Sequence, residues 1–217
     1  MQPSRPGQPI LHSCRHCPYS MRVRIVLALK GIDYAVLEER PGEWSGFMVK
    51  NVPHPRVPVL VHDGRIICES NAINEYLDGL QPEPELVPFN RSDAEHMKEW
   101  WAWCEEEFSP PIEKYENEQD SREWFKGKTE VERQLEHLET ALKRKHFLLG
   151  GKMTLADIAV IPFIAKIQSV RRDPVNFRLF PKVKVWADQI LGKPFFTQQV
   201  MKNSPFADEF PSVNTDS

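Results

Sequence analysis

The chain has 217 residues, a length that suits one large or two small domains at about 150 residues per domain. Its 28 basic and 31 acidic residues leave a net charge of -3, so it lacks the positive surplus with which proteins bind nucleic acids or anionic membranes. Hydrophobic residues make up 41% of the chain, which is enough to bury a core and excludes a disordered protein.

The ends and the apolar stretches of the chain predict where the protein is found. The first nine residues hold three prolines and no apolar run, which is not the pattern of a secretory signal. The longest apolar stretch, residues 158–165, is shorter than the roughly 20 residues that cross a bilayer. We therefore expect a cytoplasmic protein with no membrane and no nucleic-acid partner. Residues 1–7 and 206–217 are expected to form flexible ends.

The first part of the chain has the pattern of an α/β domain. It predicts, in order, a strand at 8–13, a helix at 18–30, a strand at 33–39, a connection of loop or poor helix at 41–55, strands at 57–62 and 65–68, and a helix at 70–80. Pro18 suits the first turn of a helix and Gly31 suits its end. Asp63-Gly64 favours a two-residue hairpin turn, and Ser70 can cap the last of these helices.

A linker with three prolines, residues 81–90, separates this part from an all-helical one. We place the two domains at 8–80 and 91–205. Further helices are predicted at 91–118, around the apolar stripe of Val131, Leu135, Leu138 and Leu142, from Thr154 onward, at 182–191 and near 195–202. Thr154 and Asp157 form a variant of the capping box, which fixes the start of their helix.

Cys17 directly precedes the Pro18 helix, which makes it the N-cap residue. Its sulfur is then expected to face the free N–H groups of Tyr19 and Ser20 and the positive end of the helix dipole. Both effects favour the thiolate over the thiol. A cysteine in this position, at the end of a strand, is suited to act as the nucleophile in disulfide exchange.

Cys14 and Cys17 form a C-x-x-C pair, a pattern found both in dithiol oxidoreductases and in zinc sites. With Cys17 at the N-cap, the resolving position of a dithiol enzyme falls on Ser20, which cannot form a disulfide. The alternatives for Cys14 are a packing thiol, which we favour, and a resolving partner of Cys17. A zinc site would need His12 or His16 without a second C-x-x-C pair, so we expect no metal.

A second group of residues completes a binding site for a peptide-like molecule. Pro58 starts a strand, where a proline indicates an edge, a strand start or a cis peptide. With a cis bond, Val57 would turn its backbone N–H and C=O outward to pair with an extended peptide. Glu69 and Ser70 open the next helix, where N–H groups can hold a carboxylate while Glu69 attracts an ammonium. Together they suit the zwitterionic head of an amino acid.

These motifs resemble those of the cytosolic glutathione S-transferase superfamily over about residues 8–205. The resemblance rests on Cys17-Pro18-Tyr19-Ser20, Val57-Pro58, Glu69-Ser70 and Thr154-Leu155-Ala156-Asp157. The segment HCPYSMRVR is similar to the cysteine-type classes, above all omega, whereas MRVRIVLALKGIDY is close to the zeta class. The resemblance implies a thioredoxin-like α/β domain with the order βαβαββα, followed by an all-α helical domain.

The resemblance also implies roles for individual residues. Cys17 corresponds to the cysteine that forms a mixed disulfide with glutathione, and Val57 to the residue that pairs with the cysteinyl backbone of glutathione. Pro58 corresponds to the cis proline of the family. Glu69 and Ser70 correspond to the pair that holds the γ-glutamyl head.

Lys50 resembles the omega lysine near the glycine carboxylate, although one extra residue separates it from the proline. The second substrate, a small electrophile or disulfide, is expected in the cleft between the domains, against Tyr19 and Trp101. The side chains expected in the core instead are those of Trp100, Trp103, Cys68 and Cys104. Most relatives dimerise, so we expect a homodimer.

The predicted function is glutathione-dependent thiol transfer or dehydroascorbate-type reduction, with glutathione as co-substrate. Cys17 attacks a glutathionyl sulfur, and glutathione then releases the adduct as oxidised glutathione. The alternatives are a zeta-like isomerase of maleylacetoacetate type and a conjugating transferase in which Tyr19 or Ser20 activates glutathione. A non-enzymatic protein, like the chloride-intracellular-channel proteins of the same fold, is disfavoured because Glu69 and Ser70 accompany the cysteine.

Overall fold

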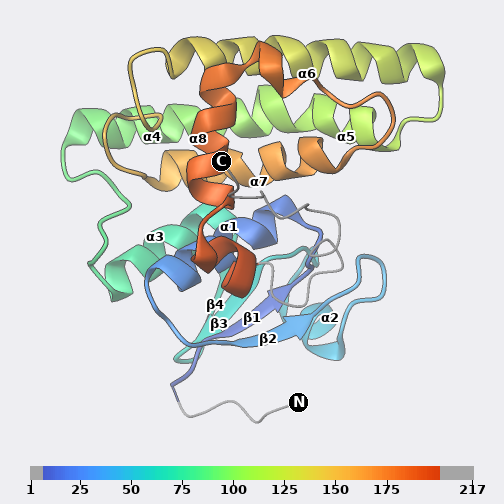
Figure 1. Ribbon diagram of the computed structural model, residues 1–217. Helices are drawn as coiled ribbons and strands as arrows, with labels where there is room; N and C mark the ends of the chain where they lie inside the picture. The colour runs from blue at the N-terminus through green and yellow to red at the C-terminus, as the bar shows by residue number, and fades with distance from the viewer. Residues whose placement is uncertain (1–6, 201–217) are drawn as a thin grey trace.

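The computed structural model describes residues 7–200, in which an α/β domain lies against a layer of helices (Figure 1). Four strands form one sheet in the order β2-β1-β3-β4. Strand β1 (Ile10–Ser13) pairs parallel with β2 (Ala35–Glu38) and antiparallel with β3 (Val59–His62), which pairs antiparallel with β4 (Arg65–Cys68). This topology confirms the predicted thioredoxin-like domain.

Three helices belong to the first domain: α1 (Pro18–Leu29), α2 (Gly46–Asn51) and α3 (Ser70–Leu80). Helix α1 begins at the predicted proline, and Gly31 takes the left-handed conformation, φ 62°, that ends a helix. Helix α2 falls in the stretch that the sequence left open between loop and poor helix. It begins where the hydroxyl of Ser45 accepts the N–H of Met48 at 3.4 Å, so a local cap stabilises this short helix.

The second domain is helical, as predicted. Its elements are α4 (Arg91–Trp103), the π-helical segment η1 (Cys104–Phe108), α5 (Ser109–Asn117), α6 (Ser121–Ala141), α7 (Leu155–Ser169), the 3₁₀ turn η2 (Phe177–Leu179), α8 (Pro181–Leu191) and the π-helical segment η3 (Phe196–Val200). All four residues of the predicted apolar stripe on α6 are buried. The expected flexible ends lie outside the described residues apart from Gly7, as does the end of the helix expected near 195–202.

The long helix expected at 91–118 is interrupted by the π-helical segment η1. Pro110 and Pro111 have no N–H to donate to the carbonyls four residues before them, which removes two bonds of an α-helix. The chain adapts with a wider turn, in which the N–H of Ser109 bonds to the carbonyl of Cys104, five residues back. The wider turn directs Glu105 and Ser109 toward the first domain, where both make contacts described below.

The connection between the domains, residues 81–90, contains no helix or strand and is held at both ends. Lys30, buried at the end of α1, donates to the carbonyls of Gln81 and Pro84 at 2.6 Å each and pairs with the carboxylate of Asp78 at 2.6 Å. The N–H of Leu155 bonds to the carbonyl of Leu86 at 2.9 Å. The proline-rich stretch is therefore tied to helices of both domains.

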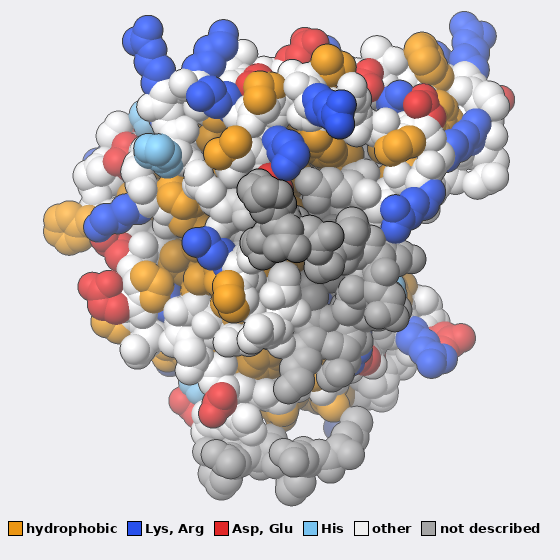
Figure 2. Space-filling view, viewed as in Figure 1, with side chains coloured by type: hydrophobic (Ala, Val, Ile, Leu, Met, Phe, Trp, Pro, Cys, Tyr) orange, Lys and Arg blue, Asp and Glu red, His pale blue; other side chains and the backbone are white. Residues whose placement is uncertain are grey.

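The face of the molecule seen in Figure 2 carries basic and acidic side chains among hydrophobic ones, in keeping with the small net charge of -3. Neither sign dominates this face. Within residues 7–200, no helix is both long enough and apolar enough to span a membrane.

The predicted capping box begins α7 and anchors the second domain. Asp157 is fully buried, and its carboxylate accepts the N–H of Thr154 at 2.9 Å, that of Leu148 at 2.8 Å and the indole N–H of Trp186 at 2.9 Å. Its pKa is raised, because burial disfavours the charge, although each of these donors opposes the rise. One side chain thus joins the start of α7, the loop before it and α8.

We predict that Asp157→Asn lowers the free energy of unfolding by about 2 kcal/mol. The substitution keeps the size of the side chain but places a second donor opposite the N–H of Thr154. Urea unfolding measures the loss. The matched control is Asp188→Asn, which alters an exposed ion pair with Lys184 and should leave the stability unchanged. Equal losses in both variants would contradict the role of Asp157.

Candidate functional site

A pocket of about 370 Å³ opens where the edge of the sheet meets the helical domain. Its lining residues come from α1, from the segment between α2 and β3, from the start of α3 and from η1: Tyr19, Val52, His54, Arg56, Val57, Pro58, Cys68, Glu69, Ser70 and Glu105. Four residues predicted to bind glutathione therefore face one space. The sequence assigned them from separate motifs, and the fold brings them together.

Glu69 and Ser70 lie at the floor of this pocket, one residue out of the predicted register. Glu69, not Ser70, is the N-cap of α3, and its side chain makes no capping hydrogen bond. Its backbone is strained for a residue other than glycine, at φ 67° and ψ 121°. Ser70 is the first helical residue and is buried, and its hydroxyl accepts from Arg22 Nη1 at 3.2 Å. The predicted capping role of Ser70 is therefore wrong.

Cys17 is the N-cap of α1, as predicted, but its sulfur does not cap the helix. The thiol instead points to the carbonyl oxygen of Val57, at a long 3.9 Å. The peptide between Val57 and Pro58 is cis. The cysteine is half-buried and lies beside the backbone group that was predicted to pair with a peptide ligand.

Lys50 lies exposed at the end of α2, outside the set of residues that line the pocket. The basic residues that do line it are His54 and Arg56, which the sequence analysis did not single out. Both belong to the segment VPHPRVP, which ends with the cis proline. The match of Lys50 to the family lysine stays a prediction.

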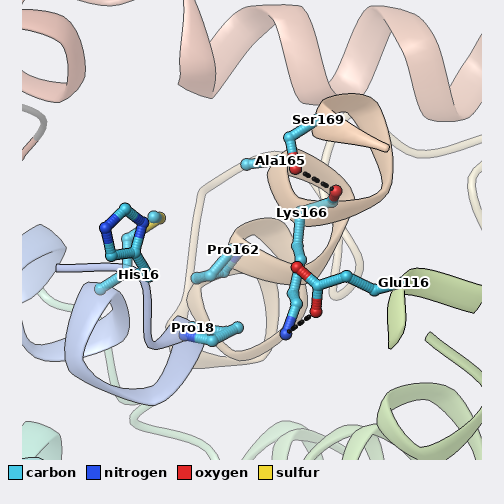
Figure 3. Close-up of a pocket in the computed structure, with 8 residues that line it drawn as sticks. His16, Pro18, Glu116, Pro162, Ala165, Lys166 and Ser169 are labelled. Carbon is cyan, nitrogen blue, oxygen red and sulfur yellow. Dashed lines mark hydrogen bonds and ion pairs between the residues drawn. The ribbon is translucent and has the colours of Figure 1, made fainter. Parts of the chain in front are cut away.

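A second, small hollow of about 20 Å³ lies on the other side of Cys17, between the start of α1 and helix α7 (Figure 3). His16 and Pro18, the two neighbours of Cys17, line it together with Pro162. Across the hollow, Lys166 and Glu116 point toward one another and form an ion pair at 2.6 Å (Figure 3). This hollow therefore has prolines on one side and a charged pair on the other, and its volume is about that of one water molecule.

The prediction of which tryptophans of α4 are buried was wrong. Trp101, expected in the cleft, is 9% exposed and donates its indole N–H to the carbonyl of Leu155 at 3.2 Å. Trp100 and Trp103, expected in the core, are only partly buried, and both contact the ring of His137 on α6 in a tilted arrangement. The buried face of α4 runs through Met97, Trp101, Cys104 and Phe108. Its 4-3-4 spacing is the signal that could have found it.

The other two cysteines differ from one another. Cys104 is buried as expected, and burial raises its pKa to about 12, so it stays a thiol. Cys68, expected in the core, is exposed on β4, because side chains alternate between the two faces of a strand and this one faces the pocket. Its pKa is raised by partial burial and by the charge of Glu69.

The hydroxyl groups near Cys17 have defined partners. Tyr19 lines the pocket, and its hydroxyl lies 3.4 Å from that of Ser109. Burial raises the pKa of Tyr19 to about 12, so the phenol stays neutral at physiological pH. Ser20 is fully buried and accepts the N–H of Cys14 at 3.3 Å, which removes it from contact with a ligand.

Arg22 joins the pocket to the helical domain and was missed by the sequence analysis. This arginine is fully buried on α1, and its guanidinium pairs with Glu105 at 2.6 Å and donates to the carbonyl of Ala159 at 2.9 Å. It also lies 4.8 Å from the centre of the Tyr19 ring, within the range of a cation–π contact. It also donates to the hydroxyl of Ser70, so this one charged group contacts residues of α1, α3, α7 and η1.

Comparison with known proteins agrees with a two-domain protein of thioredoxin-like and helical parts. A family model described as the glutathione S-transferase N-terminal domain matches residues 11–85, and one described as the C-terminal domain matches residues 92–194. The chain belongs to the glutathione S-transferase family.

Its relatives are named plant transferases. A probable glutathione S-transferase of Glycine max is 30% identical over 194 residues, or 87% of this chain and 86% of the relative. The Tau class glutathione S-transferase of mango, Mangifera indica, superposes with a TM-score of 0.81 and 27% identity over 93% of this chain and 96% of its own. Rice GST1, solved in complex with glutathione, is 24% identical with a TM-score of 0.79 over 94% and 97% of the chains and shows the fold alone. These relatives do not confirm the omega-like assignment.

We predict that Arg22→Met lowers the free energy of unfolding by about 3 kcal/mol, because it removes the guanidinium that pairs with Glu105 and donates to Ser70 and to the carbonyl of Ala159. Chemical denaturation measures the loss. Arg133→Met is the control, since the ion pairs of Arg133, with Glu130 on α6 and Glu107 on η1, are exposed and its replacement should change the stability little. A stable Arg22→Met protein would show that the contacts of Arg22 add nothing to the joining of the domains.

Proposed function

We propose that this enzyme binds glutathione in the pocket at the start of α3 and adds the glutathione sulfur to a small electrophile. Membership of the transferase family and the names of the relatives support conjugation over the thiol transfer expected from the sequence. The observation that carries the proposal is the convergence of Glu69, Ser70 and Val57 on one pocket next to Cys17.

The chemistry of the pocket fits the three parts of the tripeptide. The ammonium of the γ-glutamyl head would lie near Glu69, and its carboxylate near the hydroxyl of Ser70 and the free N–H groups that begin α3. The backbone of Val57 would pair with the cysteinyl residue. Arg56, with His54, supplies positive charge for the glycyl carboxylate at the other end. Bound in this way, the glutathione sulfur lies toward the start of α1.

At that position the sulfur meets groups that stabilise negative charge. The N-terminus of α1 carries a partial positive charge, and the thiol of Cys17 and the neutral hydroxyl of Tyr19 are donors. In conjugation the glutathione thiolate forms a bond to an electrophilic carbon, whose leaving group or π-electrons take the displaced electron pair. The pocket of about 370 Å³, which Tyr19 also lines, has room for this second substrate beside the tripeptide.

Thiol transfer through Cys17 is the second candidate, favoured by the presence of a cysteine and not a hydroxyl at this N-cap. In this reaction Cys17 would take the glutathionyl group from a mixed disulfide, and a second glutathione would release it as oxidised glutathione. The homodimer, the cytoplasmic location and the domain limits at 8–80 and 91–205 stay predictions.

We predict that Glu69→Gln weakens glutathione binding about tenfold, since it removes the charge opposite the γ-glutamyl ammonium. Isothermal titration calorimetry with reduced glutathione measures the affinity. The control is Glu75→Gln on the same helix, an exposed residue outside the pocket, which should bind like the unmodified protein. Equal affinities for the two variants would refute this placement of glutathione.

We predict that Cys17→Ser abolishes thiol transfer, with a loss of about 100-fold or more, and keeps conjugation within about tenfold, because a serine hydroxyl also donates to a thiolate. Reduction of a glutathionylated peptide and conjugation of a chlorinated nitrobenzene, assayed side by side, separate the two reactions. Thiol transfer that survives in Cys17→Ser would exclude the cysteine as the nucleophile. Absence of conjugation in the unmodified enzyme would exclude the first candidate for this class of electrophile.

A further inference from the structure

The C-x-x-C pair is folded into one tight turn, which the sequence did not predict. The N–H of Cys17 bonds to the carbonyl of Cys14 at 3.1 Å. A turn closed by such an i to i+3 bond holds its first and last Cα atoms less than about 7 Å apart. Disulfides join residues whose Cα atoms lie about 4.4–6.8 Å apart. The turn therefore keeps the two Cα atoms about as close together as a Cys14–Cys17 disulfide requires.

Two side chains of helix α1, those of Ser20 and Arg24, hold the turn in place. Ser20, which occupies the usual resolving position, instead accepts the N–H of Cys14 through its hydroxyl at 3.3 Å. Arg24, 5% exposed, donates to the carbonyl of Arg15 at 2.8 Å and to that of Cys14 at 3.4 Å. The serine therefore serves to position the upstream cysteine.

Two positively charged features lie beside the turn. The guanidinium of Arg24 donates to the carbonyl of Cys14, and Cys17 stands at the N-terminus of α1. Both cysteines are half-buried, and the sulfur of Cys17 lies 3.9 Å from the carbonyl oxygen of Val57, a residue that lines the pocket.

We propose that Cys14 is the resolving cysteine of Cys17, so that the enzyme is a dithiol system in which the resolving residue precedes the nucleophile. This inference rests on the thiol-transfer candidate above. In the first step the Cys17 thiolate attacks oxidised glutathione, forming a Cys17–glutathione disulfide and releasing one glutathione thiolate. In the second step the Cys14 thiolate attacks the Cys17 sulfur, forming the Cys14–Cys17 disulfide and releasing the second glutathione thiolate.

The balance of the two steps is that the protein loses two electrons and two protons, and one oxidised glutathione becomes two reduced ones. Two further glutathione molecules reverse both steps and restore the dithiol. The pair therefore gives the enzyme an oxidised form that stores no glutathione. In that form Cys17 is part of a disulfide and cannot act in thiol transfer until reduced glutathione restores the dithiol.

The test is intact-mass spectrometry after treatment with excess oxidised glutathione, quenched with acid. All proteins in the test carry Cys68→Ser, because Cys68 is exposed and could itself react with oxidised glutathione. Cys104 is buried and is left in place. We expect the background protein to lose two hydrogens without a lasting adduct, and the added Cys14→Ser substitution to leave a stable gain of one glutathionyl group. Glutathione release from the adduct should be about tenfold or more slower without Cys14, because the internal attack is lost.

The outcomes separate this inference from the proposed thiol transfer. A lasting glutathionyl adduct in the background protein, equal to that of the Cys14→Ser variant, would overturn the resolving role and leave thiol transfer standing. No change of mass in either protein would overturn both. Adding Cys17→Ser to the background should prevent the loss of hydrogens, and peptide mapping should find the disulfide between residues 14 and 17.

Discussion

The buried guanidinium of Arg22 is the contact on which the rest of the site depends. A charge removed from water is costly unless it is paired and hydrogen-bonded, and Arg22 has both a carboxylate, Glu105, and neutral acceptors on α3 and α7. Because these partners come from both domains, the guanidinium can be satisfied only when the helical domain is docked against α1. The same group also donates to the hydroxyl of Ser70, which lines the candidate pocket, so the docking of the domains and the lining of this pocket are coupled.

The π-helical segment η1 explains how the second domain brings Glu105 and Ser109 into contact with the first domain. Without the wider turn before Pro110 and Pro111, an α-helical register would carry Glu105 and Ser109 to different positions around the helix. In the observed register Glu105 meets Arg22 and Ser109 meets the hydroxyl of Tyr19. The wider turn before the two prolines is therefore the part of the second domain that contacts Arg22 and Tyr19 of the first.

Local rules predicted much of the fold, and they failed where partners lie far apart in the chain. The start of α1 at Pro18 and the capping box at Asp157 depend on neighbouring residues and were predicted correctly. Arg22 could not be predicted as a buried residue, since its partners lie 48 to 137 positions away. The error at Trp101 was of another kind. The 4-3-4 spacing from Met97 to Phe108 was present in the sequence, and choosing Trp100 and Trp103 as the buried face ignored it.

Cys17 illustrates why the class of a site follows from its surroundings more than from one residue. The cysteine suggested thiol exchange, whereas the relatives are named for transfer of glutathione, and the pocket chemistry serves both. Conjugation needs a donor at the start of α1 that stabilises the glutathione thiolate, and a thiol or a hydroxyl can supply it. Thiol exchange needs in addition a sulfur that attacks and a route for release of the adduct. The turn that joins residues 14 and 17 offers such a route without a second glutathione, which a hydroxyl at the same position could not use.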